Sequence, residues 1–340
     1  MRWPGVGEVV LGRFRLDTPL GRGATGQVYA GADQRDGASV AVKVMHPLLA
    51  SAYTARKRFT REAEALARVS HARVPRFVAS GFEGAAPVLV TERLWGEDLQ
   101  SMIERAGRLS ADLALAVAAG VADGLDAAHR VGVLHRDVKP ANVFCVGGAP
   151  AVGAVRVLDF GAALCADLSR VTASVDSVGT PRFRAPEQDG AVGAATPASD
   201  VYSLGLTLRA LARDRSLDPR TERYIEMLTS PDPMDRPCPA GVVAMTLRAL
   251  AAGGDGVLDV PSGLVVPPTA PRENLERARR CARELRAASM SGWRLRQSLA
   301  AVDDPPVQAS VDEIHAGGRA ACERWMRELG EALPPFGARA

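Results

Sequence analysis

Two short runs of polar residues contain the side chains of this 340-residue sequence that are best suited to chemistry. The run HRDVKPANVF holds Asp137, Lys139 and Asn142, and the run VLDFG holds Asp159. The carboxylate of Asp137 can accept the proton of a hydroxyl group, and the ammonium group of Lys139 can neutralise a phosphoryl group in transit. Asn142 and Asp159 offer oxygen ligands of the kind that Mg²⁺ uses. These residue types indicate transfer of a phosphoryl group.

Lysine is rare in this sequence, which makes its positions informative. Lysine and arginine together number 42, yet lysine occurs only at Lys43, Lys57 and Lys139. A position that keeps lysine against this bias is expected to need a compact ammonium group rather than a planar guanidinium. Lys43 and Lys139 lie at positions where a compact positive charge could contact phosphate oxygens. Lys57 lies on the solvated face of a predicted helix.

The run LGRGATGQVYA places Gly21, Gly23 and Gly26 in the spacing G-x-G-x-x-G, followed by Val28. Glycines let backbone N–H groups approach phosphate oxygens without a Cβ atom in the way. A dinucleotide-binding fold carries the same spacing, but there the glycines lead into a helix. Here the next residues alternate as in a strand. A glycine-rich hairpin that binds no ligand is the other interpretation of this run.

Lys43 lies in the apolar run VAVKV, which has the pattern of a strand. A lysine in such a setting is rarely buried without an anion. Glu62 on the following helix is the natural partner. Glu64 is the competing one, but residues two positions apart on a helix point to different sides. The alternative is an edge-strand lysine whose ammonium group reaches solvent.

The elements that must position these residues follow from hydrophobic periodicity. Alternating apolar residues predict strands within 11–45 and at 88–94, and helical spacing predicts a helix over 54–69. The apolar face of that helix contains Phe59, Ala63, Leu66 and Val69. Short strands are predicted at 143–146 and 155–158. Further helices are predicted at 98–105, 110–130, 198–212, 219–229 and 237–251. The result is an α+β chain with a small β-rich lobe and a larger α-helical lobe.

The motifs, taken in order, resemble those of the bacterial eukaryotic-like serine/threonine protein kinases. They are G-x-G-x-x-G-x-V, A-V-K, H-R-D-x-K-P-x-N, D-F-G and A-P-E. The resemblance implies a bilobal protein kinase fold. It also implies an enzyme that transfers the γ-phosphate of ATP, with Mg²⁺ or alternatively Mn²⁺, to serine or threonine hydroxyls of protein substrates. Its own activation loop is expected to be among those substrates.

The resemblance also implies roles for individual residues. Asp137 is the catalytic base, Lys139 steadies the γ-phosphate, and Asn142 and Asp159 bind the metal. Lys43 holds the α- and β-phosphates and pairs with Glu62. Thr91 is the gatekeeper, with the hinge from Glu92 to Leu94, and Val28, Ala41 and Phe144 sandwich the adenine. The expected nucleotide-binding set is Leu20, Gly21, Arg22, Gly23, Ala24, Gly26, Val28, Ala41, Lys43, Glu62, Thr91, Glu92, Leu94 and Phe144. Away from the nucleotide, Glu187 is expected to pair with Arg236.

Arg136 precedes the catalytic aspartate and is expected to need an anion from the segment that follows D-F-G. A phosphate at Thr172 or Ser174 would supply charge-assisted hydrogen bonds, and Ser177 is the third candidate. The family places such sites a few residues before the threonine of the G-T pair, here Thr180. The alternative is a segment ordered by packing alone.

The resemblance, together with composition, predicts four parts along the chain. Residues 1–13 form an N-terminal segment, 14–250 the kinase domain, 251–271 a linker rich in glycine and proline, and 272–340 a helical extension. The extension is basic in its first half and acidic in its second, so self-docking or a regulatory partner is expected there. A solvated helical hairpin without a regulatory role is the alternative.

The connection after the helix at 198–212 is too short for the further helix that related kinases insert. The lower α-helical lobe is therefore expected to be trimmed. The apolar surface there is expected to be less covered than in related kinases, at Leu206, Leu208, Tyr224 and Leu228. A partner protein, or the chain's own helices in 272–340, is expected to cover it. The alternative is that repacking hides this surface and nothing docks there.

Other features exclude several functional classes. A net charge of +3 is too small to argue for nucleic-acid binding. Five scattered cysteines argue against a disulfide framework or a zinc site and favour a reducing compartment. No apolar run is long enough to span a membrane, and no secretory leader is visible, so we expect a cytoplasmic protein. A pseudokinase that only binds ATP, and a phosphotransferase for small molecules, are the rival functions.

Overall fold

A computed structural model describes most of the kinase-like part of the chain. The described residues are 4–23, 26–47, 53–148, 150, 154–160, 183–189, 195–212, 217–253, 257–259 and 264–266. The chain forms two compact units. Unit 1 contains Met1–Met102 and Ala127–Arg182, and unit 2 contains Ile103–Asp126 and Phe183–Ala340.

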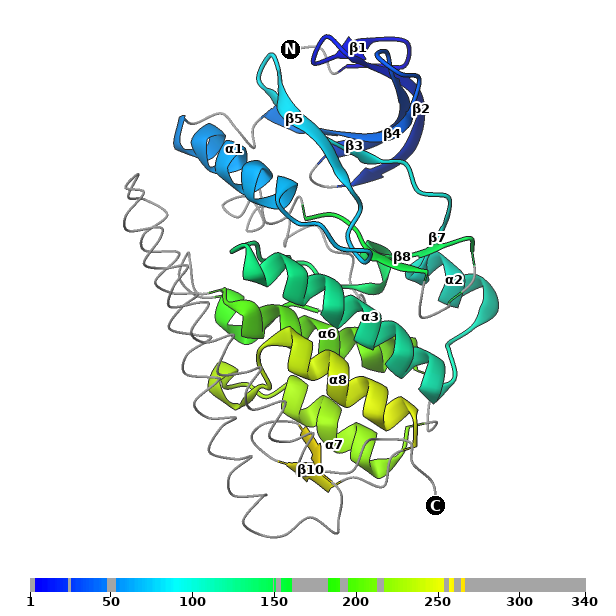
Figure 1. The fold of residues 1–340 in the computed structure, drawn as a ribbon, viewed down its shortest axis with the longest axis vertical. Helices are drawn as coiled ribbons and strands as arrows, with labels where there is room; N and C mark the ends of the chain where they lie inside the picture. Colours follow the sequence, from blue (N-terminus) through cyan, green and yellow to red (C-terminus); the bar gives the residue numbers. More distant parts are fainter. Residues whose placement is uncertain are drawn as a thin grey trace. The chain divides into compact units, whose positions relative to one another are not determined.

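Unit 1 is built on a six-stranded antiparallel sheet, which Figure 1 shows as strongly curved. Its strand order is β1-β2-β3-β4-β6-β5. The strands are β1 (Val9–Val10), β2 (Phe14–Gly23), β3 (Gly26–Asp33), β4 (Ser39–Met45), β5 (Phe77–Glu83) and β6 (Ala86–Glu92). One face holds the core, because side chains alternate across a strand. The core includes Phe14, Leu16, Tyr29, Val40, Val42, Val44, Val88 and Val90.

The N-terminal segment expected at 1–13 contributes Val9 and Val10 to this sheet. β1 pairs with β2, and Val10 is fully buried in the core. The backbone N–H of Leu11 donates to Glu83 Oε2 at 2.8 Å. A Cβ atom on Gly81 would lie 2.8 Å from Leu11 Cδ2, so the leucine packs directly on β5. These contacts join Leu11, the residue after β1, to β5, the last strand in the sheet order.

Helix α1 (Tyr53–Ala67) packs against β5 and β6, and Figure 1 shows it beside β5. Phe59 and Phe82 make an edge-to-face contact, with ring centroids 5.2 Å apart. The predicted apolar face is confirmed, because all four of its residues are buried, namely Phe59, Ala63, Leu66 and Val69. Glu62 directly precedes the buried residue Ala63 and is itself only partly exposed, so it lies at the border of the packed face of α1.

A second, three-stranded sheet completes the described part of unit 1. It has the order β7-β8-β9, with β7 (Gly96–Asp98), β8 (Val143–Val146) and β9 (Val155–Val157). Helix α2 (Leu99–Ala106) begins directly after β7. The short helix η2 (Pro140–Asn142) leads into β8, and this places the catalytic-loop residues at the start of a strand.

Unit 2 is mainly helical in its described part. It contains most of α3 (Ala111–Arg130), with α6 (Pro197–Leu211), α7 (Pro219–Leu228) and α8 (Ala240–Ala251). Its short helices are η3 (Pro186–Asp189) and η4 (Pro233–Asp235). Gly241 N donates to Asp126 Oδ1 at 3.0 Å, which ties α8 to α3. The range expected as a linker also contains a hairpin of β10 (Val257–Asp259) and β11 (Leu264–Val266), and β11 contacts α8.

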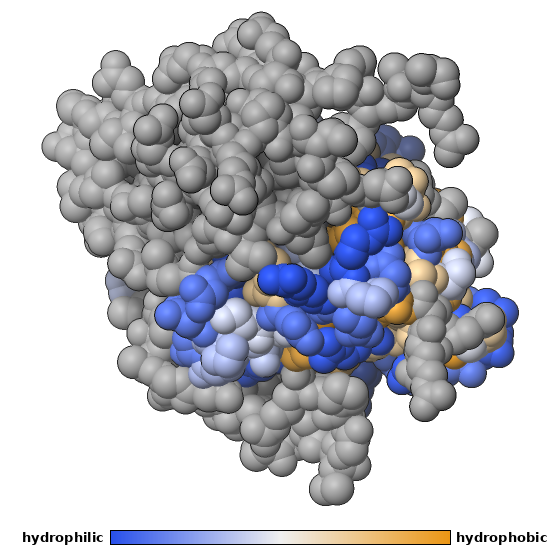
Figure 2. Space-filling view, turned by 90° about the horizontal axis from the view of Figure 1, so that it is seen from below, coloured by the Kyte–Doolittle hydropathy of each residue, from blue (hydrophilic) through white to orange (hydrophobic). Residues whose placement is uncertain are grey.

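The apolar positions expected to be less covered in this unit are buried. Leu208, Tyr224 and Leu228 are fully buried, and Leu206 is partly buried. Only Ala212–Asp218 separates α6 from α7, and the two helices pack directly on one another. Figure 2 looks at the molecule from below Figure 1, and the described residues visible there are mainly hydrophilic, with small hydrophobic spots.

Gly205 makes the close approach of α6 and α7 possible. A Cβ atom at this position would lie 2.8 Å from both Leu228 Cβ and Thr229 Cγ2. We expect Gly205→Ala to lower the free energy of unfolding by about 1–3 kcal/mol through overpacking, despite the roughly 1 kcal/mol that alanine gains in helix propensity. Urea unfolding followed by circular dichroism would measure the change.

Thr229→Ser provides the matched control for this substitution. It removes Cγ2 but keeps the hydroxyl that donates to Ile225 O at 2.8 Å. Added to Gly205→Ala, it should restore part of the lost stability. A Gly205→Ala protein that is more stable than the original chain would contradict the proposed close contact.

Candidate active site

The predicted catalytic-loop residues are brought together around the Asp137 carboxylate. Lys139 Nζ lies 2.8 Å from Asp137 Oδ2, and Asn142 Nδ2 donates to the same oxygen at 3.0 Å. Asn142 Nδ2 also donates to the Asp137 carbonyl oxygen at 2.8 Å. Both side-chain contacts involve Oδ2, so the contacts recorded among the described residues leave Oδ1 as the oxygen that can accept a substrate proton.

His135 connects this loop to the strand end that carries Asp159. It is fully buried, and its Nε2 lies 2.7 Å from the Leu158 carbonyl oxygen. Asp137 N donates to His135 Nδ1 at 3.2 Å, so the neutral ring with the proton on Nε2 satisfies both contacts. The ring also lies 4.8 Å from that of Phe160. Sequence reasoning gave His135 no role, although it opens the H-R-D motif.

Substitution of His135 is expected to disturb the site without touching a reacting group. His135→Ala leaves Leu158 O and Asp137 N without their ring partner and opens a cavity. The resulting misplacement of the loop that carries Asp137 is expected to lower kcat by about 10–10²-fold. Steady-state kinetics at saturating ATP would measure the loss. An unchanged kcat in a folded variant would show that the two loops hold their positions without the ring.

The ion pairs around Lys43 differ from the predicted arrangement. Lys43 Nζ contacts Asp159 Oδ1. Glu62, the expected partner of Lys43, lies 3.9 Å from Arg136 Nη1. Arg136 and Asp159 both have positive φ angles, of 67° and 60°, an uncommon conformation for residues other than glycine. The choice between two carboxylates for one ammonium group depends on side-chain distances that strand and helix patterns do not specify.

The sheet register places the predicted nucleotide-binding residues on one face. Val28 lies opposite Gly21 on one side and Lys43 on the other. Ala41 lies opposite Thr91. These positions alternate with the core positions on β3, β4 and β6, so they lie on the sheet face opposite to the core.

The glycine-rich hairpin projects into solvent. Leu20, Gly21, Arg22 and Gly23 are all exposed, and Ala24 lies outside the described residues. Gly26 has a φ of +157°, and a Cβ atom there would lie 2.3 Å from Val44 O, so this glycine is required where the hairpin meets β4.

The predicted hinge is fixed at its start and followed by a second short sheet. Glu92 N donates to Arg76 O at 2.9 Å, and Arg76 N donates to Glu92 Oε1 at 2.9 Å. Leu94 follows and is partly buried. Phe144 on β8 lies opposite Asp98 on β7.

Sequence reasoning missed Asp98, which accepts hydrogen bonds from Ser101 N and Oγ at 2.9 and 2.7 Å. An acid just before a helix was the available signal.

The two predicted metal ligands fit a hard cation with few protein ligands. Leu158 N donates to Asn142 O at 2.8 Å, which holds the residue before Asp159 against Asn142. Because Asn142 Nδ2 donates to Asp137, its Oδ1 is the side-chain atom that is left to ligate a metal. The described residues contain no group of three or more histidine, cysteine or acidic residues able to hold a metal. A pair of oxygen ligands completed by phosphate and water is what Mg²⁺ commonly uses.

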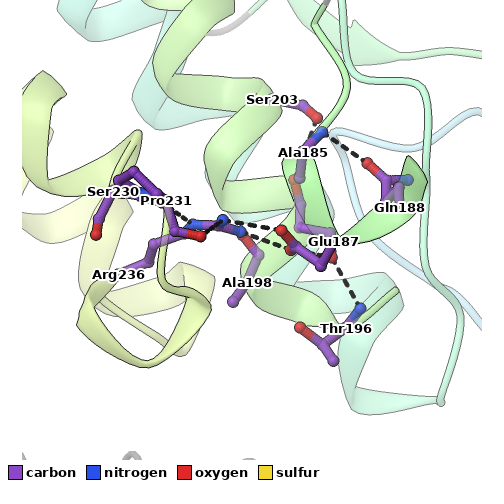
Figure 3. Close-up of polar contacts among 10 residues, drawn as sticks. Ala185, Glu187, Gln188, Thr196, Ala198, Ser203, Ser230, Pro231 and Arg236 are labelled. Carbon is purple, nitrogen blue, oxygen red and sulfur yellow. Dashed lines mark hydrogen bonds and ion pairs between the residues drawn. The ribbon is translucent and has the colours of Figure 1, made fainter. Parts of the chain in front are cut away.

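The predicted pair of Glu187 and Arg236 is confirmed in unit 2 (Figure 3). Arg236 Nη1 and Nη2 donate to the two carboxylate oxygens at 2.6 and 2.9 Å. The arginine also donates to three carbonyl oxygens, those of Ala198, Ser230 and Pro231. Burial raises the pKa of Glu187, but hydrogen bonds from Arg236 and Ser199 outweigh this, so the net pKa lies below its usual value. The pair anchors the A-P-E segment.

Several predicted features lie outside the described residues. They are the phosphorylation candidates Thr172, Ser174 and Ser177 and the extension 272–340. Within the part of the chain that the structure describes, no helix has both the length and the apolar character needed to cross a membrane.

Comparison with known proteins agrees with this geometry. The chain is 38% identical over 255 residues to serine/threonine-protein kinase pkn2 of Myxococcus xanthus, a match that covers 71% of the chain and 30% of that protein. It is 40% identical over 209 residues to PknA of Mycobacterium tuberculosis, covering 60% of the chain and 47% of that protein. The chain thus spans less than half the length of these relatives.

The fold resembles that of a solved kinase domain. The PknI kinase domain of Mycobacterium tuberculosis matches with a TM-score of 0.56 and 27% identity, over 72% of this chain and 98% of that structure. The protein kinase domain family matches residues 14–232, which exceeds half of the sequence. The chain therefore belongs to the protein kinase domain family, whose members use ATP and a divalent metal.

Proposed function

We propose that this chain is a serine/threonine protein kinase that uses Mg-ATP. The observation that carries the proposal is the set of contacts around Asp137. Lys139 and Asn142 both contact Oδ2, and His135 links the loop to the strand end that carries Asp159. Phosphoryl transfer depends mainly on positioning and on charge stabilisation, and these contacts supply both. A lysine two residues after the catalytic aspartate supports serine and threonine rather than tyrosine as acceptors.

The proposed reaction moves one proton and one phosphoryl group. Asp137 Oδ1 accepts the proton of the substrate hydroxyl, and the hydroxyl oxygen forms a bond to the γ-phosphorus. The bond from the γ-phosphorus to its bridging oxygen breaks, and ADP leaves. Lys139 offsets charge on the transferred group, and Lys43 is proposed to hold the α- and β-phosphates. A divalent metal at Asn142 and Asp159, with Mg²⁺ preferred and Mn²⁺ as the alternative, would neutralise phosphate charge.

One assay distinguishes this function from its rivals. The full chain is incubated with γ-labelled ATP and Mg²⁺ or Mn²⁺, together with a protein acceptor such as casein or with small-molecule alcohols. Label on serine or threonine of the protein supports the proposal. Nucleotide binding without transfer would favour a pseudokinase, and label on the small molecules alone would favour the other phosphotransferase.

Phosphorylation of the activation segment is a proposed part of this function. Arg136 lies near Glu62, and a phosphate is a stronger acceptor for a guanidinium than a carboxylate. A phosphate at Thr172 or Ser174, with Ser177 as the third candidate, would compete with Glu62 for Arg136 and order the segment.

We expect autophosphorylation to raise activity, and we expect the double substitution Thr172→Ala, Ser174→Ala to prevent most of that rise. Mass spectrometry after incubation with ATP would locate the phosphates. A fully active enzyme without phosphate on Thr172, Ser174 or Ser177 would contradict the idea.

The cellular location and the partners of the chain are also proposed. A reducing, cytoplasmic location fits the scattered cysteines, and protein substrates fit the family. The extension 272–340 is proposed to dock on the chain itself or on a regulatory partner. No role for nucleic acid is proposed.

A further inference from the structure

The outward side of α1 carries a stripe of exposed residues that packing does not use. Tyr53, Lys57, Arg61 and Glu64 recur at spacings of three and four, so they share one side of the helix. Arg68 follows directly after the helix ends. All five residues are exposed, and they are called the α1 outer face below.

The opposite side of α1 is already filled. Phe59 and Ala63 are almost fully buried, and Phe59 packs on Phe82 of β5. Arg56 lies over the same Phe82 ring, 3.8 Å from its centroid. These contacts fix the rotation of the helix. The α1 outer face is therefore presented to solvent by a rigid element.

The charges of this face are unbalanced. It holds three cations, Lys57, Arg61 and Arg68, against the single acid Glu64. Among the described residues, the structure records no carboxylate partner for the side chains of these three cations. Arginines elsewhere in the described chain have such partners, as at Arg13 with Asp33 and Arg209 with Glu222.

Tyr53 adds an apolar anchor at one end of the face. It is 80% exposed, the highest exposure among the large hydrophobic side chains of the described chain. Tyrosine and arginine are enriched among the residues that dominate binding energy at protein interfaces, because they combine apolar area with hydrogen bonding. The face thus offers one aromatic ring beside a row of cations.

We propose that the α1 outer face is a docking surface for an acidic segment of a partner protein, with Tyr53 as its anchor. A second copy of this chain is disfavoured, because a two-fold contact would set Lys57, Arg61 and Arg68 against like charges. A uniform polyanion such as nucleic acid is also disfavoured, because Glu64 lies within the row of cations. An acidic polypeptide can place carboxylates at the cations and an apolar side chain at Tyr53.

Binding of a defined probe tests the surface on the full chain. The probe is a fluorescent peptide of repeated Glu-Glu-Leu units, with Gln-Gln-Leu and Lys-Lys-Leu peptides and single-stranded DNA as comparisons. We expect fluorescence anisotropy to show that the acidic peptide binds and that the comparison probes do not. The affinity for the acidic peptide should fall as the salt concentration rises. DNA that binds more tightly than the peptide would overturn the choice of a protein partner.

Charge variants locate the binding. Arg61→Glu should weaken the peptide's affinity by about fivefold or more at low salt, whereas Arg223→Glu, at an exposed helical arginine of α7, makes the same charge change as a control. Glu64→Lys should strengthen binding. Tyr53→Ala should weaken it, and Tyr53→Phe should keep most of it. Equal effects of Arg61→Glu and Arg223→Glu would overturn the proposal.

The rarity of lysine gives a direct readout of contact. A water-soluble carbodiimide joins amines to carboxylates that touch. Outside the catalytic loop, where Lys139 pairs with Asp137, Lys57 is the one exposed lysine among the described residues. We expect the peptide to crosslink to Lys57, and Lys57→Arg to remove the crosslink while binding remains. A crosslink from Lys57 to carboxylates of the same chain, with no peptide product, would show that the chain covers this face itself and would overturn the partner assignment.

Discussion

Asp137→Asn should lower the rate of phosphoryl transfer by about 10²–10⁴-fold, the usual contribution of a general base. The substitution keeps the size of the side chain and can still accept hydrogen bonds from Lys139 and Asn142, which lie 2.8 and 3.0 Å from Oδ2. The amide oxygen is a poor proton acceptor, so chemistry is lost while the loop is held. Initial rates with γ-labelled ATP would measure the change.

Nucleotide binding separates this effect from damage to the site. The affinity for ATP should be almost unchanged in Asp137→Asn, because no contact of Asp137 with the nucleotide-binding face of the sheet is proposed. Asp159→Asn provides the contrast, since its carboxylate contacts Lys43 and is the proposed metal ligand. It should lose metal-dependent transfer as well as affinity for Mg-ATP. Transfer by Asp137→Asn at the original rate would remove Asp137 from its role as base.

The sequence allowed good predictions wherever one periodic element decides the outcome. The apolar face of α1 follows from 3.6-residue spacing, and Phe59 and Ala63 are buried as that spacing requires. The alternation on β4 places Lys43 on the sheet face opposite to the core residues Val42 and Val44. The pair of Glu187 and Arg236 was predicted from the family's motifs, not from periodicity, since the residues lie far apart in the sequence.

Predictions failed or were missed where the outcome depends on tertiary distances. The sequence offered Glu62 and Glu64 as partners of Lys43, and only the folded chain shows its contact with Asp159. His135 acts through a buried ring whose two nitrogens meet different loops. The positions expected to be less covered on α6 and α7 are buried, and Gly205 lets the two helices meet closely. No local pattern encodes these contacts.

The largest stability effect is expected at Arg236. Its side chain is 0% exposed and that of Glu187 is 15% exposed, so the pair lies in a poorly solvated setting. Arg236→Met removes five donated hydrogen bonds and leaves a carboxylate without its cation. Removal of one partner of a buried ion pair costs about 3–5 kcal/mol. Urea unfolding of the full chain should show a loss of this size.

A surface pair of the same chemistry serves as the control. Arg209 Nη2 lies 3.3 Å from Glu222 Oε2, and both side chains are about half exposed. Arg209→Ala should cost less than about 1 kcal/mol, as is usual for solvated ion pairs. A loss at Arg236→Met no larger than this would show that unit 2 does not depend on the buried pair.

The response to pH provides a second, independent test of the same pair. The pKa of Glu187 is lower in the folded chain than its ordinary value of 4.5, because the hydrogen bonds from Arg236 and Ser199 outweigh the opposing effect of burial. The pair's contribution is therefore complete above that ordinary value and is lost as the pH falls through the lower, folded-state pKa. Glu187→Gln, which has no charge to lose, should flatten this part of the stability profile. In the Arg236→Met background, Glu187→Gln should also restore stability, since it removes the uncompensated buried charge. If Glu187→Gln and the original chain lose stability in parallel below pH 4.5, the carboxylate at 187 does not carry the charge that holds Arg236.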